Sequence, residues 1–399
     1  MREEVFNVPN LRFPEFIKPY SQTTISKLAT IVGGGTPDTT VQEYWNGGIQ
    51  WFTPSEIGKN KYADKSERTI SQEGLNNSSA KLLPINTILL STRATIGESS
   101  IAKEECCTNQ GFQSLIANEE IVCYEYLYYL VATLTKELIR KSCGSTFLEI
   151  SANEVRKIKT FIPNLEEQRK VSSLLSLIDE RIATQIKIIE DLKKLKSAIS
   201  KLLFARKDLL ETTICLSDIA TLKNGYAFQS SKYNPLGKWK ILTIANVPGE
   251  RNINDEDCNC IINLPSDIQN HQVLKEGDML ISLTGNVGRV SLCTDGNYLL
   301  NQRVGLLQLK QGVNREYIYQ ALSCRRFEQT MISCGQGAAQ MNIGKGDVED
   351  YTIPYSANSL NLEVVASTLK TYDLLISVEV DRLRLFMQQK QYLLAQMFI

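Results

Sequence analysis

Cysteine and histidine are the side chains that most often bind metals or act as nucleophiles, and this chain spaces them poorly for either task. Ten cysteines are present, the closest being Cys106 with Cys107 and Cys258 with Cys260, and His271 is the single histidine. No two cysteines form a Cys-x-x-Cys pair. Zinc sites need paired ligands, and Ser-His or Cys-His catalysis needs a histidine beside the nucleophile. We therefore expect reduced thiols, no bound metal and no catalytic residues of these kinds.

The sequence also lacks the signatures of methyl transfer and of nucleotide hydrolysis. It contains no N-P-P-Y or D-P-P-Y string, no F-x-G-x-G loop and no G-x-x-x-x-G-K-[ST] phosphate loop. The nearest strings, at 234–236 and 344–346, do not qualify. The chain is therefore expected not to be an enzyme and to carry no cofactor of its own.

Length and composition predict a soluble globular protein of two to three domains. The 399 residues are 43% hydrophobic and 22% charged, and the longest apolar run, 127–134, is far too short to span a membrane. The N-terminus has no signal-peptide pattern, so we expect the cytoplasm. Net charge is zero. Because strongly basic balance is typical of nucleic-acid binders, any phosphate contact must be local or shared with partner chains.

Residues 164–206 predict one long helix, since they contain neither proline nor glycine. Apolar residues recur there with the heptad spacing of a coiled coil. The a and d positions are Val171, Ile178, Gln185, Leu192 and Ile199, and Leu175, Ile182, Ile189, Lys196 and Leu203. Eight of these ten are apolar.

The same seam returns at the C-terminus, and its polar exceptions fall in the same two slots. The a and d positions there are Val365, Tyr372, Glu379, Phe386 and Leu393, and Leu369, Ile376, Leu383, Lys390 and Met397. If the helices pair antiparallel, Glu379 lies opposite Lys196 and Lys390 opposite Gln185, and these partners set the register. An ordinary helical hairpin or a homodimerisation helix shows the same periodicity.

The stretches outside the helices repeat as well. Residues 49–58 and 239–249 are rich in aromatic and β-branched side chains and predict strands. Residues 82–102 and 273–293 each predict a strand, a polar loop and a second strand. The chain is thus expected to be one module of roughly 190 residues, duplicated.

Each half continues with a predicted amphipathic helix, at 124–141 and 315–332, and closes on a strand ending Ile-Pro. The predicted fold class is α+β, with two pseudo-repeated α/β domains separated by two long helices that form an antiparallel coiled coil. The predicted segments are an N-terminal arm at 1–19, a first domain at 20–163, a central spacer helix at 164–206, a second domain at 207–354 and a C-terminal spacer helix at 355–399.

Several motifs occur in a fixed order along the chain. They are GGTP at 34–37, EYWNGGIQWFTPSEI at 43–57, STRATIG at 91–97, NQGF at 109–112, GSTFLEIS at 144–151, IPNLEEQRKV at 162–171, LTGNVG at 283–288, NQR at 301–303 and AAQMNIG at 338–344. With these motifs the chain resembles the specificity subunits of Type I restriction-modification systems over essentially its full length. One departure is that the second half opens with NGYAF, so the GGTP turn is not expected to carry across.

The resemblance implies a non-catalytic subunit with two target recognition domains. Each domain would read one half of a bipartite, asymmetric site on double-stranded DNA, and the coiled coil would set the unread gap. The resemblance also implies two methylation subunits and motor-nuclease restriction subunits as partners. Those partners would supply S-adenosylmethionine, ATP and magnesium.

Given that resemblance, the matched loops at 91–97 and 282–288 are candidates for base contacts. Both have a serine at the start and a glycine at the end, and the side chains between differ. Arginine can bond guanine O6 and N7 as a pair, and asparagine can bond adenine N6 and N7. The candidates here are Arg93, Thr95, Thr284, Asn286 and Arg289. The two arginines fit equally well as ordinary surface or ion-pair residues.

Further candidate DNA contacts lie outside these loops. They are Thr36, Gln110, Lys240, Gln302 and Arg303, with Lys59, Lys61, Lys65 and Arg68 as a phosphate patch. The glutamines fit turn capping as well, and the lysines fit a solvated loop.

A different class of function also fits. The protein can be a scaffold or adaptor whose coiled coil organises partner proteins while its globular halves bind peptides or glycans. The neutral net charge is the best support for this alternative.

Overall fold

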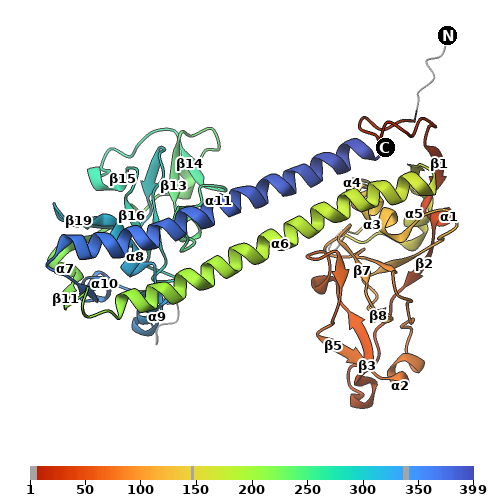
Figure 1. The fold of residues 1–399 in the computed structure, drawn as a ribbon, viewed down its shortest axis with the longest axis horizontal. Coiled ribbons are helices and arrows are strands. Elements are labelled where there is room, and N and C mark those ends of the chain that lie inside the picture. The colour runs from red at the N-terminus through yellow and green to blue at the C-terminus, as the bar shows by residue number, and fades with distance from the viewer. Residues whose placement is uncertain (1–6, 145–147, 336–340) are drawn as a thin grey trace, which may run out of the picture. The chain divides into compact units, whose positions relative to one another are not determined.

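The computed structural model describes residues 7–144, 148–335 and 341–399, so parts of the motifs at 144–151 and 338–344 lie outside the described residues. The chain divides into two compact units, residues 1–186 with 382–399 and residues 187–381. Each unit combines a globular body of sheets and short helices with parts of two long helices (Figure 1).

The described residues of the first unit form three sheets. The strand orders are β2-β9-β6-β7-β4, β5-β3-β8 and β1-β10. The strands are β1 (Ser21–Thr24), β2 (Ala29–Gly33), β3 (Trp45–Phe52), β4 (Tyr62–Ala63), β5 (Arg68–Ile70), β6 (Ile88–Leu90), β7 (Ser99–Ala102), β8 (Cys106–Thr108), β9 (Gln113–Ala117) and β10 (Lys159–Ile162). The predicted strand at 49–58 stops at Phe52, because Pro54 opens a 3-10 turn capped by Thr53 and Glu56.

The second unit repeats most of this topology, with four strands in each of its two larger sheets where the first unit has five and three. Its strand orders are β12-β19-β16-β17, β14-β13-β18-β15 and β11-β20. The strands are β11 (Thr212–Cys215), β12 (Ala220–Asn224), β13 (Trp239–Leu242), β14 (Asn259–Ile261), β15 (Val273–Leu274), β16 (Met279–Ser282), β17 (Val290–Leu292), β18 (Tyr298–Leu300), β19 (Val304–Leu309) and β20 (Thr352–Tyr355). In both units the matching pairs, β3 with β8 and β13 with β18, are parallel, and the first unit has a further parallel pair, β4 with β7. The predicted duplication is therefore visible in the strand order.

The short helices follow the same plan, but the two predicted amphipathic helices are each broken. The helices are α1 (Ile25–Leu28), α2 (Gln72–Asn76), α3 (Tyr124–Thr133), α4 (Thr135–Arg140), α5 (Ala152–Lys157), α7 (Leu216–Ile219), α8 (Arg315–Leu322), α9 (Arg325–Cys334) and α10 (Lys345–Glu349). At the first break the hydroxyls of Thr133 and Thr135 donate to backbone carbonyls, which competes with the helix ladder. At the second break the backbone of Cys324 is extended, so the helix is interrupted there before α9 begins.

The long helices are α6 (Leu165–Phe204) and α11 (Ser359–Met397), and they bury the predicted seam. In the first unit Val171 and Leu175 of α6 share a core with Leu393 and Met397 of α11. In the second unit Leu203 and other α6 residues pack against the core that contains residues from the start of α11. The helices are therefore antiparallel within each unit, as the heptad pattern predicts.

The ion pairs that the two seam lysines form are with other acids than the predicted opposite residues. Lys196 Nζ lies 2.5 Å from Asp373, and Lys390 Nζ lies 2.6 Å from Asp179. Both acids stand nearly two helical turns before the expected partners, Glu379 and Gln185.

The globular bodies explain these choices of partner. Gln320 of α8 donates to Asp373 at 2.6 Å, and Tyr129 of α3 donates to Asp179 at 2.6 Å. Each acid is thus held from the body, and the flexible lysine stem reaches it from the seam. Gln185 and Glu379 remain in the seam, 3% and 8% exposed. Among the described residues, none of the helices has the length and apolar character needed to cross a membrane.

Candidate nucleic-acid interface

Three segments of the first unit meet at one place, which we call the first crossing. The backbone N–H of Gly35 donates to Thr108 at 2.8 Å, and that of Thr92 donates to Gly111 at 2.9 Å. Arg93 also forms an isolated antiparallel bridge with Glu149. The glycine turn after β2, the loop after β6 and the turn after β8 are thereby held together.

The second unit has the same arrangement, the second crossing. Tyr226 donates to Leu300 at 2.8 Å and Leu283 donates to Arg303 at 3.0 Å. Thr284 forms the isolated bridge with Asn342. Every bond of the first crossing thus has a counterpart at the matching place.

Close backbone approach requires glycine at both crossings. A Cβ on Gly34 would lie 2.0 Å from the carbonyl oxygen of Asn109, and a Cβ on Gly225 would lie 2.1 Å from that of Asn301. Gly225 therefore takes the place of Gly34, although NGYAF does not resemble GGGTP. The expectation that the glycine turn does not carry across is wrong for the backbone.

Asparagine builds the turn that presents each glutamine. The N–H of Gly111 donates to Asn109 Oδ1 at 2.9 Å, and the N–H of Arg303 donates to Asn301 Oδ1 at 3.1 Å. Asparagine favours such turns because its side chain bonds the backbone two residues on. The glutamine between, Gln110 or Gln302, is left at the tip with its side chain exposed.

The first crossing brings three of the predicted residues together. Arg93 donates to Glu149 at 2.5 Å, with the two side chains 44% and 39% exposed. Thr36 Oγ1 donates to Gln110 Oε1 at 2.5 Å. Thr95 instead donates to Ser91 at 3.0 Å and so braces the loop itself. At the tip Ala94 has φ of 64°, a strained value for a residue with a side chain.

The second crossing presents different side chains on that frame. Thr284 donates to Asn342 at 3.1 Å. Asn286, Gln302 and Arg303 are exposed, and within the described ranges no side-chain partner is recorded for them. Asn342, Glu149 and Tyr226 were missed by sequence reasoning because a β-bridge partner far along the chain leaves no local pattern.

Comparison with known proteins identifies the module that carries these crossings. The family model of the Type I restriction modification DNA specificity domain matches residues 18–194 and 211–383. The chain belongs to this family.

Individual relatives agree with the family match. The MjaIX specificity subunit of Methanocaldococcus jannaschii is 36% identical over 188 residues, 46% of this chain and 43% of that protein. The EcoR124I/EcoR124II specificity subunit of Escherichia coli is 29% identical over 163 residues, 39% and 40% of the two chains. The matches thus span less than half the length of these two relatives. The MjaVIII specificity subunit of M. jannaschii is 24% identical over 95% of this chain and 91% of its own.

Two solved structures share the fold of this specificity-domain chain. One is the S subunit of a Type-I restriction-modification system from M. genitalium, with a TM-score of 0.58, 16% identity, and 98% and 99% of the chains covered. The other is a chain from a structure that concerns the structural basis of complex assembly and conformational transition of the type I R-M system. It has a TM-score of 0.59, 16% identity and coverage of 96% and 98%.

In the first specificity domain the residues of the predicted phosphate patch differ in exposure: Lys59, Lys65 and Arg68 are exposed and Lys61 is not. Lys61 Nζ lies 2.7 Å from Glu125 and 2.6 Å from Ser176 of α6, and its side chain is 11% exposed. It therefore ties the body to the long helix and does not form part of an exposed phosphate patch. Arg68 lies over the ring of Trp45 at 3.5 Å, a cation–π contact.

In the second specificity domain two predicted residues turn away from the crossing. Arg289 Nε lies 3.4 Å from Glu328 of α9. Lys240 Nζ lies 2.6 Å from Asp255, and this hydrogen bond raises the pKa of Lys240 and lowers that of Asp255. Arg289 and Lys240 thus form ion pairs within the domain. For Arg289, an ion pair is the alternative to a base contact that the sequence left open.

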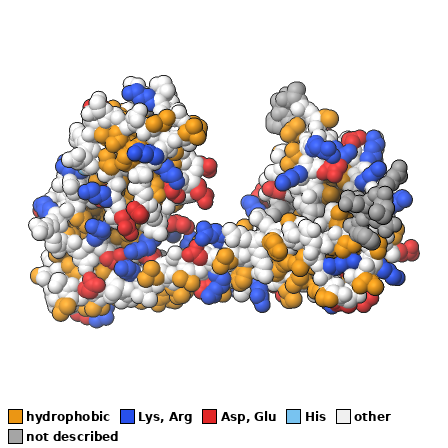
Figure 2. Space-filling view, turned by 90° about the horizontal axis from the view of Figure 1, so that it is seen from above, with side chains coloured by type: hydrophobic (Ala, Val, Ile, Leu, Met, Phe, Trp, Pro, Cys, Tyr) orange, Lys and Arg blue, Asp and Glu red, His pale blue; other side chains and the backbone are white. Residues whose placement is uncertain are grey.

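Surface charge is mixed. Figure 2 shows lysine and arginine side chains interspersed with aspartate and glutamate over the visible face of each unit. This agrees with the net charge of zero for the chain.

Proposed function

We propose that this chain is the non-catalytic DNA-specificity subunit of a Type I restriction-modification complex. Each crossing would read one half of a bipartite, asymmetric site on double-stranded DNA. The observation that supports this is the twin backbone frame with different side chains. Arg93 and Glu149 stand where the second unit has Thr284 and Asn342.

The chemistry of the side chains fits base reading. The exposed ion pair between Arg93 and Glu149 is worth at most about 1 kcal/mol, so it is easily exchanged for base contacts. Arginine can then bond a guanine, while glutamate accepts from a cytosine amino group. At the second crossing the amides of Asn286 and Gln302 suit adenine. The two crossings would therefore select different bases.

Partner docking is supported by exposed apolar residues with heptad spacing outside the buried seam. On α6, Ile188, Leu195 and Leu202 are 40%, 47% and 68% exposed. On α11, Val364 and Val378 are 51% and 54% exposed. Such a second stripe suits helices of partner subunits. We propose two methylation subunits there, with motor-nuclease subunits added for cleavage and S-adenosylmethionine, ATP and magnesium brought by these partners.

Replacing Arg93 by alanine tests the reading of the first half. We expect recognition of one half-site to fall by about 1–3 kcal/mol per lost base contact, with the other half unchanged. The measurement is methylation by the assembled complex on duplexes substituted in one half at a time. Arg289→Ala is the control, because Arg289 faces α9. Equal loss at both halves after Arg93→Ala would contradict separate reading.

Lengthening both long helices tests whether they set the gap. Inserting one heptad into α6 and a matching heptad into α11 keeps the seam in phase. We expect a longer unread gap, by about 10 Å or three base pairs at 1.5 Å per helical residue and 3.4 Å per base pair, with both half-sequences retained. Sequencing of methylated sites gives the result, and an unchanged gap would rule out this role.

A further inference from the structure

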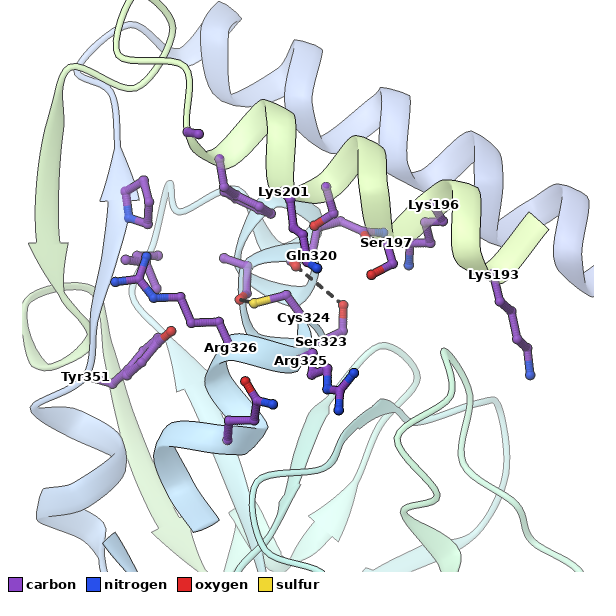
Figure 3. A pocket seen from close by; sticks show the side chains of 17 residues that line it. Lys193, Lys196, Ser197, Lys201, Gln320, Ser323, Cys324, Arg325, Arg326 and Tyr351 are labelled. Carbon is purple, nitrogen blue, oxygen red and sulfur yellow. Dashed lines mark hydrogen bonds between the residues drawn. The ribbon is translucent and has the colours of Figure 1, made fainter. Parts of the chain in front are cut away.

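The second unit contains a cavity of about 520 Å³ between the C-terminal part of α6, the junction of α8 with α9, and β20 (Figure 3). Phe204, Ala321, Ile353 and Pro354 are among its lining residues and supply an apolar floor. A volume of this size is in the range of known ligand sites. We call it the basic pocket.

Positive charge surrounds this floor. Lys201 of α6 and Arg325 and Arg326 of α9 line the pocket and are exposed. Within the described part of the chain, no carboxylate partner is recorded for any of the three, and no aspartate or glutamate is among the lining residues. Lys193 and Lys196 also line it but are paired with Glu250 and Asp373.

Two of the three cations, Lys201 and Arg326, reach toward the floor from different helices. In Figure 3, Lys201 reaches down from α6 and Arg326 extends from α9 toward the strand that follows Tyr351. Burial raises the pKa of Tyr351 to about 12, and the charge of the nearby Arg326 opposes that rise. An anionic ligand seated here would meet guanidinium on one side and ammonium on the other.

In the first unit the positions that match the three unpaired cations of the basic pocket are not basic. Lys390 and Lys196 occupy the same seam slot, so Lys201 corresponds to Ala395 and Ser200 to Leu394, which packs against the first core. Tyr129 donates to Asp179 of α6 as Gln320 donates to Asp373 of α11, so Tyr129 and Gln320 are equivalent positions. Counting forward from them, Arg325 and Arg326 correspond to Leu134 and Thr135. The charges are therefore not needed to build the module.

The basic pocket is also separate from the second crossing. It lies at the start of α9, whereas the end of that helix, at Gly335, approaches Asn342 of the crossing. A helix of ten residues is about 15 Å long. A ligand in the pocket therefore leaves the base-reading side chains free.

We propose that the basic pocket receives an acidic segment of a partner polypeptide, with an apolar side chain on the floor and carboxylates beside Lys201, Arg325 and Arg326. That the partner is a subunit of the same complex rests on the proposed function. That the pocket suits an acidic segment with an apolar side chain rests on its lining residues alone. A DNA duplex fits less well, since its phosphates lie on a convex surface and it offers no apolar side chain to this floor.

The test uses the full chain and short overlapping peptides that span its methylation and restriction subunits. We expect an acidic peptide with an aromatic or aliphatic residue to bind, and Lys201→Glu to weaken that binding about tenfold or more. Lys194→Glu is the matched control, because Lys194 lies on the same helix, is 74% exposed and is not a lining residue. We expect the Lys194→Glu variant to bind the acidic peptide as tightly as the unaltered chain does.

Three results would overturn the proposal: no acidic peptide binds, Lys194→Glu weakens binding as much as Lys201→Glu, or an unrelated duplex displaces the peptide. Circular dichroism of both variants separates a lost contact from a lost fold. Half-site reading by the assembled complex is measured independently. If the Lys201→Glu variant no longer binds the peptide but still reads both half-sites, peptide docking and DNA specificity are separate properties. If half-site reading fails while the peptide still binds to the unaltered chain, the proposed DNA-reading function is wrong and the proposal for the pocket stands.

Discussion

Replacing Gly34 by alanine is expected to remove recognition of one half-site while the other half is still read. The new Cβ would lie 2.0 Å from the carbonyl oxygen of Asn109 and 2.4 Å from that of Thr108. These are backbone atoms and cannot rotate away. Overpacking of this kind costs about 1–3 kcal/mol, and relief must move the turn that holds Gln110. We expect at least about a tenfold loss, measured by methylation of duplexes altered in one half.

The second crossing supplies the mirror experiment. Gly225→Ala meets Asn301 O at 2.1 Å, so it should affect the other half-site only. Gly48→Ala is the control, because a Cβ there has no neighbour within 4 Å. If Gly34→Ala and Gly225→Ala impaired the same half, the crossings would not be separate reading sites. Thermal unfolding of each variant distinguishes a shifted turn from global unfolding.

Replacing Glu167 by alanine is expected to destabilise the first unit by about 3–5 kcal/mol. The Glu167 side chain is fully buried and accepts from Arg12 Nε and Nη2, both at 2.7 Å. Its removal leaves the Arg12 side chain, which is 10% exposed, without its carboxylate partner. Tyr20, whose hydroxyl lies 3.3 Å from both Glu167 and the Met397 carbonyl, loses a partner too. The N-terminal arm would then lose its buried ion pair with α6.

Chemical unfolding followed by tryptophan fluorescence measures this cost, because Trp45 and Trp51 lie in the first unit and only Trp239 in the second. Glu166→Ala is the neighbouring control. Glu166 is exposed, so we expect a change within about 0.5 kcal/mol. A similar small change for Glu167→Ala would show that the arm does not depend on this ion pair.

The fold was largely predictable because its signals are local and repeated. Heptad spacing is read within one helix, and both copies bury that seam in the structure. The strand-loop-strand pattern also appears twice, as β6 with β7 and β16 with β17. Errors came where a local competitor ended an element, as Pro54 does after β3.

The candidate site was predictable only in part. Arg93, Gln110 and Thr36 do converge. Motifs repeated in the second half marked Arg93 and Gln110, and the glycine-rich turn marked Thr36. Lys61 and Arg289 do not, because the carboxylates that hold them, Glu125 and Glu328, lie far along the chain. A charged side chain is drawn to whichever opposite charge the fold brings near, and no periodicity reports that distance.

By itself the sequence determined the duplicated plan, the long helices and the absence of familiar catalytic motifs, because periodicity and motif order are properties of neighbouring residues. The tertiary structure alone decided which acids hold Lys196 and Lys390, that Gly225 plays the part of Gly34, and that Lys201 and Arg326 border one pocket. These depend on contacts between segments distant in the chain, where burial and packing select the partners.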